Sequence, residues 1–141
     1  MNQAQPLIND PSRGFKGFVP AVFGYRVAAL FTREVGDLAY LKLTAPAELV
    51  RNPANAPDPW EQSMFTARFA VPGWNKSGYL AEEAQLNGKS AYRLLIPEYY
   101  EASCLSCHGE PKGERDISGG RKEGGKLGDL GGAISAAIYL K

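Results

Sequence analysis

Cysteine and histidine are scarce in this chain of 141 residues, which contains two cysteines and one histidine. So few cysteines exclude a scaffold built on several disulfides, and a chain of this length buries roughly two thirds of its unfolded surface, so it can fold without them. The chain also has no large excess of charge of either sign, because its 16 basic residues nearly balance its 15 acidic residues and the net charge is +1. This balance argues against nucleic acid or an anionic membrane surface as the partner.

Long apolar runs are absent as well. No segment of the sequence approaches the roughly 18 consecutive apolar residues of a transmembrane helix. Residues 1–30 lack the basic start, the continuous apolar stretch and the small-residue cleavage site of a secretory signal. The composition is therefore that of one soluble domain.

The spacing of apolar residues predicts two main helices and four strands, arranged as an antiparallel α+β sheet. The first helix is expected over Phe18–Val35, with Pro20 in its first turn and Gly36 beyond its end. Its apolar stripe comprises Val19, Phe23, Val27, Leu30 and Phe31. After a proline-rich connector, Ala45–Pro57, a second helix starts at the capping-box-like Asp58-Pro59-Trp60-Glu61. The strands are expected over Leu38–Thr44, Tyr79–Leu86, Ser90–Ile96 and Ala133–Leu140.

Turn-forming residues organise the second half of the chain. Asn87-Gly88 is typical of a two-residue hairpin turn, so the strands on either side should pair antiparallel. Pro97 is expected to end the second strand of this hairpin, and Glu98–His108 to form a short helix or turn. Nine of the 16 glycines lie between Gly109 and Gly132, which predicts a long loop wrapped over a functional feature. A disordered, solvated loop is the alternative.

Every cysteine and the only histidine lie within five residues, Cys104-Leu105-Ser106-Cys107-His108. This is the C-x-x-C-H sequence to which c-type haem is attached. Two thiols at this spacing can each add to one vinyl group of the porphyrin, and the histidine that follows is then placed under the iron as its proximal ligand. The motif predicts one covalent haem c held by Cys104, Cys107 and His108.

Three other chemistries are compatible with the motif but less favoured. A structural zinc site needs four ligands, and without further cysteine or histidine it would require two carboxylates or a partner chain. A thioredoxin-like dithiol belongs in a βαβ setting, whereas this motif follows an antiparallel hairpin. A disulfide between Cys104 and Cys107 would close too small a loop to stabilise the domain much.

The far side of the iron is left open by the sequence. Because His108 is the only histidine, ligation by two histidines of one chain is excluded. The candidates are Met64, Met1, a lysine, a tyrosine, water or no ligand at all. Met64 lies on the predicted second helix and could equally fill space in the core. A methionine ligand favours electron transfer, whereas a vacant or water-bound position can accept a diatomic gas.

Two further groups of residues are expected around the haem. The aromatic rings of Tyr99 and Tyr100, just before the motif, are candidates for walling its pocket. Arg115 is a candidate partner for a haem propionate, together with three other cations of the glycine-rich loop, Arg121, Lys122 and Lys126. The alternative for these cations is a solvated, charged loop.

The chain contains six unusual segments in a characteristic order: Gly14–Ala21, Leu41–Thr44, Arg51–Glu61, Ser103–Gly109, Gly113–Gly119 and Gly128–Ser135. In these segments the chain resembles the c-type haem PAS-like sensor domain family. The resemblance implies a PAS-like antiparallel sheet flanked by helices, with haem c held by the C-x-x-C-H cysteines. It also implies a single sensor domain over residues 14–141, after an N-terminal extension of residues 1–13.

The resemblance carries expectations about setting as well. Such domains are extracytoplasmic and occur alone or as the sensory part of membrane-bound histidine kinases, chemotaxis receptors and cyclic-dinucleotide enzymes. Some members carry a cysteine on the N-terminal helix as the second iron ligand. The corresponding helix here, Phe18–Val35, contains no cysteine, so that ligand is not carried over.

These observations predict a haem-c sensor domain that responds to redox state or to a diatomic gas such as nitric oxide. A small periplasmic electron-transfer cytochrome is the alternative. An enzyme is not expected, because the only histidine is assigned to iron and no carboxylate pair stands out. Haem c is attached outside the cytoplasm in bacteria, so we expect a periplasmic location, with the export signal or anchor outside this chain. The expected partners are haem, a gas or redox partner and a membrane-linked signalling output, with a homodimer left open.

Overall fold

The computed structural model describes Pro6, Asp10, Ser12 and residues 19–141. Its main helices are α2 (Pro20–Val35), α3 (Pro59–Met64) and α4 (Leu105–His108). The strands β1 (Ala39–Thr44), β2 (Leu80–Leu86), β3 (Lys89–Tyr99) and β4 (Leu130–Tyr139) form one antiparallel sheet in the order β1-β4-β3-β2. The predicted α+β class, an antiparallel sheet flanked by helices, is therefore confirmed.

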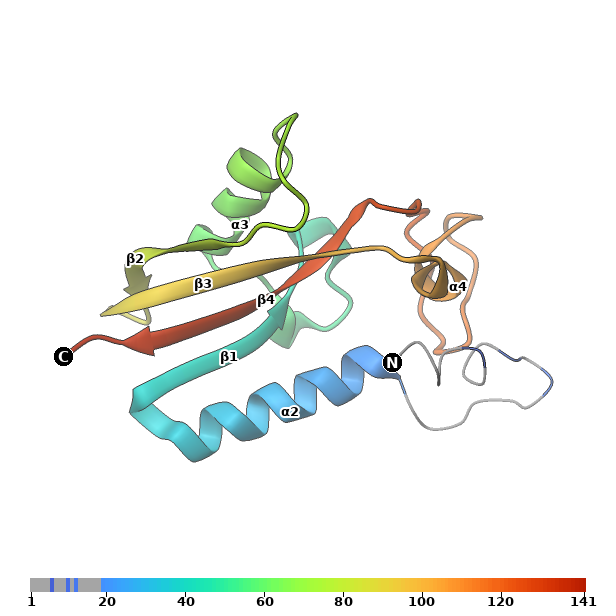
Figure 1. Ribbon diagram of the computed structural model, residues 1–141. Coiled ribbons are helices and arrows are strands. Elements are labelled where there is room, and N and C mark those ends of the chain that lie inside the picture. The colour runs from blue at the N-terminus through green and yellow to red at the C-terminus, as the bar shows by residue number, and fades with distance from the viewer. Residues whose placement is uncertain (1–5, 7–9, 11, 13–18) are drawn as a thin grey trace.

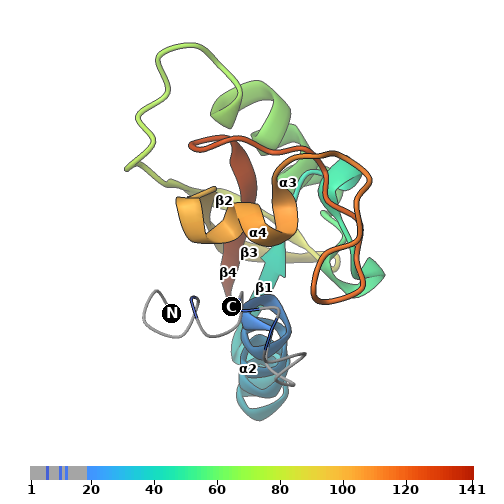
Figure 2. The same cartoon turned by 90° about the vertical axis from the view of Figure 1, so that its right-hand side faces the viewer.

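The helices occupy different places around this sheet (Figure 1). Helix α2 runs along β1 on one face, and α3 lies over the opposite face. This arrangement follows from the alternation of side chains along β1, where successive residues point to opposite faces of the sheet. Leu43 faces Gly24 of α2, whereas the preceding residue, Lys42, reaches Glu61 of α3 on the other face. Helix α4 lies at one end of the sheet, and Figure 2 views the molecule from that end, with α4 in front of the strands.

The face beneath α3 contains the main core. Phe65, Phe69, Leu80, Leu95 and Ala133 are buried together, and Trp60, Met64, Trp74 and Leu130 pack against them. Asp58 begins α3 with the predicted capping box: its side chain accepts from the backbone N–H of Glu61, and the Glu61 carboxylate accepts from the backbone N–H of Asp58. The chain continues from α3 into a π-helical turn, Phe65–Phe69.

A buried ionic cluster joins α3 to the sheet. Arg93 of β3 and Glu61 are 1% and 0% exposed. Arg93 donates to Asp58 at 2.6 Å and lies 3.5 Å from Glu61, whose other oxygen accepts from Lys42 at 2.7 Å. The Arg93 guanidinium also lies over the Trp60 ring, 4.1 Å from its centroid. These contacts fix α3 against the sheet through charges that are shielded from water.

Helix α2 forms within the predicted range and packs against the sheet through small side chains. Ala28 is its buried residue, Gly24 lies against Leu43, and the Thr32 hydroxyl donates to the carbonyl of Leu41 and accepts from its N–H. Small side chains let the helix approach β1 closely, whereas Phe23, Val27, Leu30 and Phe31 of the predicted stripe are exposed. The apolar stripe therefore does not face the sheet, and the expected start of the helix at Phe18 lies outside the described residues.

The hairpin is confirmed, with one correction at its second strand. Asn87 and Gly88 have positive φ angles of 53° and 76°, as a two-residue turn between β2 and β3 requires. Strand β3 does not end at Pro97 but continues to Tyr99, pairing with β4. The pairing with β2 reaches only Leu95, so proline, which lacks an N–H, lies where one side of β3 has no neighbouring strand.

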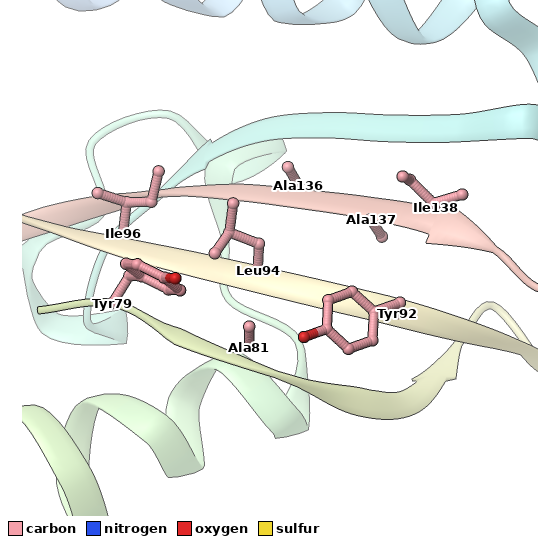
Figure 3. Close-up of a pocket in the computed structure, with 8 residues that line it drawn as sticks. All are labelled: Tyr79, Ala81, Tyr92, Leu94, Ile96, Ala136, Ala137 and Ile138. Carbon is pink, nitrogen blue, oxygen red and sulfur yellow. The ribbon is translucent and has the colours of Figure 1, made fainter.

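The face of the sheet that carries α2 is open beyond β1 (Figure 3). Tyr79, just before β2, and side chains from β2, β3 and β4 project from it, and the exposed ones are Tyr79, Tyr92, Ile96 and Ile138. They surround a shallow apolar hollow that also includes Ala81, Leu94, Ala136 and Ala137. In the part of the chain that the structure describes, no helix is both long and apolar enough to cross a bilayer.

Candidate functional site

The C-x-x-C-H motif forms a compact helical segment at the end of β3. A 3-10 turn, Ala102–Cys104, leads directly into α4, so Cys104, Cys107 and His108 follow one another at helical spacing and share one side of the turn. Gly109 ends α4 by donating its N–H to the carbonyl of Leu105 at 2.8 Å. A Cβ at this position would lie 2.5 Å from the same carbonyl oxygen, so the tight exit after His108 needs glycine.

Both thiols are free and only partly buried. Burial raises the pKa of the Cys107 thiol, and a hydrogen bond from the Ser106 hydroxyl partly offsets this effect. The two sulfur atoms are therefore not joined in a disulfide.

The His108 ring has one contact at its edge, with Glu123, and one on its face, with Tyr100. Its Nδ1 lies 2.8 Å from Oε2 of Glu123, and the Tyr100 ring stacks on it with centroids 5.1 Å apart and an 18° angle between planes. An ionised carboxylate only accepts hydrogen bonds, so Nδ1 is the protonated nitrogen, and Nε2 is left with the lone pair that can bind a metal.

Tyr100 lies in a slot lined by glycine. A Cβ on Gly125 or on Gly131 would overlap the edge of the Tyr100 ring. The β3–β4 register shifts between Glu98 and Tyr99, which leaves Gly131 as the extra residue beside the ring. Burial, with the nearby Glu123 charge, raises the pKa of Tyr100 to about 12, so its hydroxyl stays protonated at physiological pH.

Arg51, in the connector between β1 and α3, is the centre of a hydrogen-bond network around α4. Its Nε donates to Glu123 Oε1 at 2.5 Å and its Nη1 to Asp116 Oδ2 at 2.5 Å. Its Nη2 donates to Glu123 Oε2 at 3.0 Å and to the carbonyl oxygens of Cys107 at 2.7 Å and Arg121 at 3.0 Å. One guanidinium therefore joins the connector, α4 and the glycine-rich loop.

These contacts determine the charge states at the site. Burial by itself would raise the pKa of the Glu123 carboxyl, but hydrogen bonds from Arg51 and His108, together with the Arg51 charge, hold it below its ordinary value. The pKa of Asp116 is lowered in the same way by Ser118 and Arg51, against the effect of burial. Burial would lower the pKa of Arg51, but both carboxylates raise it overall. The network is therefore one cation between two carboxylates.

The structure brings together only some of the residues singled out from sequence. Cys104, Cys107, His108 and Tyr100 lie at one site. Tyr99 lies under Lys76, whose Nζ is 4.9 Å from its ring centroid, and Arg115 donates to the carbonyl of Gly119 within the loop. The role proposed for each in haem binding stays a prediction.

The remaining candidates have partners of their own. Met64 packs against the hydrophobic cluster beneath α3, and Figure 1 shows α3 over the sheet with α4 beyond its end. Its ligation of iron stays a prediction. Two of the loop cations are engaged inside the loop, since Arg121 donates to the carbonyl of Gly113 at 2.8 Å and Lys122 pairs with Glu114. The predicted loop is therefore folded on itself rather than extended.

Three site residues were not predicted as such: Arg51, Asp116 and Glu123. Arg51 and Asp116 lie in two of the family-like segments, which was the available signal, whereas Glu123 is one of several carboxylates in the loop and lies outside those segments. Among the described residues, no group of three or more Cys, His, Asp or Glu is arranged to hold a metal ion.

The donor set fits a covalently attached haem. Two free thiols at C-x-x-C spacing precede a histidine whose Nδ1 is occupied by Glu123, so Nε2 is the nitrogen available to iron. The partly exposed α4 leaves these groups accessible, with 30% of the His108 side chain exposed.

Comparisons with known proteins agree with this interpretation. The crystal structure of the cyanobacterial heme-protein Tll0287 is similar, with a TM-score of 0.63 and 19% sequence identity over 88% of this chain and 74% of that chain. At this identity the similarity shows a shared fold. No curated protein sequence matches significantly. A family model described as Tll0287-like matches residues 1–138, nearly the whole chain, which confirms the family expected from sequence. This protein belongs to the Tll0287-like family.

Proposed function

We propose that this protein is a sensor domain that carries one covalent haem c on α4. The observation that carries the proposal is the arrangement of Cys104, Cys107 and His108 on one helical turn, with Glu123 on Nδ1 of the histidine. Membership of the Tll0287-like family supports it, since the family's namesake is described as a heme-protein.

In the proposed attachment, each thiol adds across one vinyl group of the porphyrin. A sulfur–carbon bond forms at one vinyl carbon, and the thiol proton is added to the other, so that no separate oxidant is needed. His108 would supply Nε2 to the iron as a ligand. When bound, the haem would provide an iron that changes oxidation state or binds a diatomic ligand.

Sensing is favoured over catalysis and simple electron transfer because His108 is hydrogen-bonded to a residue of a long loop. Glu123 joins the histidine to the loop over residues 109–129, and Arg51 joins both to the connector. A change in the oxidation state or ligand of the iron could therefore alter the hydrogen bonds of segments that are far away in sequence. An enzyme is not favoured, because the only histidine of the sequence is the proposed iron ligand and no carboxylate pair stands out in it. Because haem c is attached outside the cytoplasm in bacteria, the proposed location is extracytoplasmic, with the signal passed to a partner or to another part of a longer protein.

The attachment is tested by co-expression with a cytochrome c maturation system and pyridine haemochrome spectra. We expect one haem c per chain in the wild type, a spectrum characteristic of a single thioether in Cys104→Ser or Cys107→Ser, and no covalent haem in the double variant. Ser103→Ala, next to the motif, is the control and should match the wild type. A b-type spectrum or no haem in the wild type would overturn the proposal.

The same preparation separates the sensor from the electron carrier. Binding of carbon monoxide or nitric oxide by the ferrous protein supports a gas sensor. Indifference to both gases, together with the far-red ferric band of a methionine ligand, would instead indicate an electron-transfer cytochrome. Met64→Ala then tests that ligand, because an unchanged spectrum excludes it.

A further inference from the structure

Glu123 contacts His108 from 15 residues further along the chain, and both of its carboxylate oxygens are engaged. Oε2 lies 2.8 Å from Nδ1 of His108 and 3.0 Å from Nη2 of Arg51. Oε1 accepts from Nε of Arg51 at 2.5 Å. Because the guanidinium binds both oxygens, the carboxylate cannot rotate away from the imidazole without losing this two-point contact.

The two neighbours of the ring control different degrees of freedom. Stacking on Tyr100 restrains the plane of the His108 ring. The hydrogen bond to Glu123 restrains rotation within that plane and holds the proton on Nδ1, so that Nε2 points away from the carboxylate.

Arg51 fixes the position of the Glu123 carboxylate relative to α4. Its Nη2, which contacts Glu123, also donates to the carbonyl of Cys107 at 2.7 Å. Glu123 therefore keeps a fixed position relative to the helix that carries both thiols and His108, although it belongs to a loop. The Glu123 side chain is 14% exposed, so little solvent competes for its hydrogen bonds.

We propose that Glu123 is the positioning residue of the iron ligand His108: it orients Nε2 and, through its negative charge, strengthens electron donation from the ring. The inference rests on the proposed haem function. A carboxylate partner raises the basicity of a ligating histidine. Stronger donation stabilises ferric over ferrous iron, so Glu123 lowers the midpoint potential of the haem.

The test compares midpoint potentials of the haem-loaded protein. Glu123→Gln keeps an oxygen that can accept from Nδ1 but removes the charge, so we expect the midpoint potential to rise. Glu114→Gln is the matched control, because Glu114 is a carboxylate of the same loop that pairs with Lys122 and not with His108. Its potential should equal that of the wild type.

Glu123→Asp provides a second route if the glutamine variant does not accumulate. It keeps the charge but draws the carboxylate back, and a smaller rise in potential is expected. Wild-type potentials in every Glu123 variant that carries haem, or an equal rise in Glu114→Gln, would overturn the inference. A wild-type protein without covalent haem would instead overturn the proposed function, and the haem content of each sample separates the two failures.

Discussion

At the scale of single residues, the Tyr100 ring depends on what its neighbours lack. Gly125 and Gly131 leave room for its edges, and the shift in the β3–β4 register places Gly131 beside it. The loop is also bonded to its backbone, since Tyr100 donates its N–H to Asp129 and accepts from the N–H of Gly128, both at 2.8 Å. Tyr100 is 8% exposed, so its ring contacts His108 rather than solvent.

Replacing Tyr100 by leucine should therefore disturb the histidine as well as the fold. We expect Tyr100→Leu to lower the free energy of unfolding by about 2–4 kcal/mol, because a buried ring and its stacking contact are lost. The haem spectrum should change too, whereas Tyr100→Phe should keep the wild-type spectrum. Tyr79→Leu, at an exposed tyrosine just before β2, is the control and should keep the wild-type spectrum. An unaltered spectrum in Tyr100→Leu would show that the stack does not orient His108.

At the scale of elements, α2 and α3 attach to the sheet by different means. Helix α2 uses the small side chains of Gly24 and Ala28, while α3 uses hydrophobic packing and the buried charges of Arg93 and Glu61. A buried ion pair is costly to break, because the remaining charge keeps its desolvation cost without its partner.

We therefore expect Arg93→Met to lower the free energy of unfolding by about 3–5 kcal/mol, since Asp58 and Glu61 lose their shared cation. Urea denaturation of the two proteins measures this loss. Arg68→Met, an exposed arginine on the π-helical turn, serves as the control and should stay within about 0.5 kcal/mol of the wild type. A similarly small loss in Arg93→Met would mean that the cluster does not anchor α3.

At the scale of the whole molecule, Arg51 joins segments that are far apart in sequence. Its carboxylate partners are 65 and 72 residues away, and the Cys107 carbonyl is 56 residues away. The loop over residues 109–129 has little regular structure, so its position depends strongly on these contacts.

Arg51→Ala should release the loop while the sheet stays folded. Hydrogen bonds to charged groups contribute about 1.5–3 kcal/mol each, so trypsin cleavage at Arg115, Arg121 and Lys122 should become roughly ten- to a hundred-fold faster. Arg51→Lys should rescue only part of this protection, because an ammonium group cannot bind both oxygens of Glu123 in a planar fork. Lys89→Met, which removes an exposed pair with Asp37, is the control. Equal cleavage rates in all four proteins would contradict the role of Arg51.

Features encoded over a few residues could be predicted. The hairpin at Asn87-Gly88 and the capping box at Asp58 were identified because their signals lie within single turns. The end expected at Pro97 was wrong because the tolerance for proline depends on whether β2 runs alongside, which is a property of the sheet. The side of α2 that meets the sheet could not be predicted for a similar reason, since periodicity describes an apolar stripe but not the surface that the stripe meets.

The sequence by itself determined the chemistry that we propose for the site, because the proposed covalent attachment of haem depends on residue spacing within one helical turn. Cys104, Cys107 and His108 are neighbours in any helical conformation of that segment, and the lack of a second histidine follows from composition alone. Only the tertiary structure decided what surrounds His108. Glu123, Arg51 and Tyr100 reach it through loop folding, a register shift and long-range hydrogen bonds, whose energies depend on contacts that no local pattern encodes.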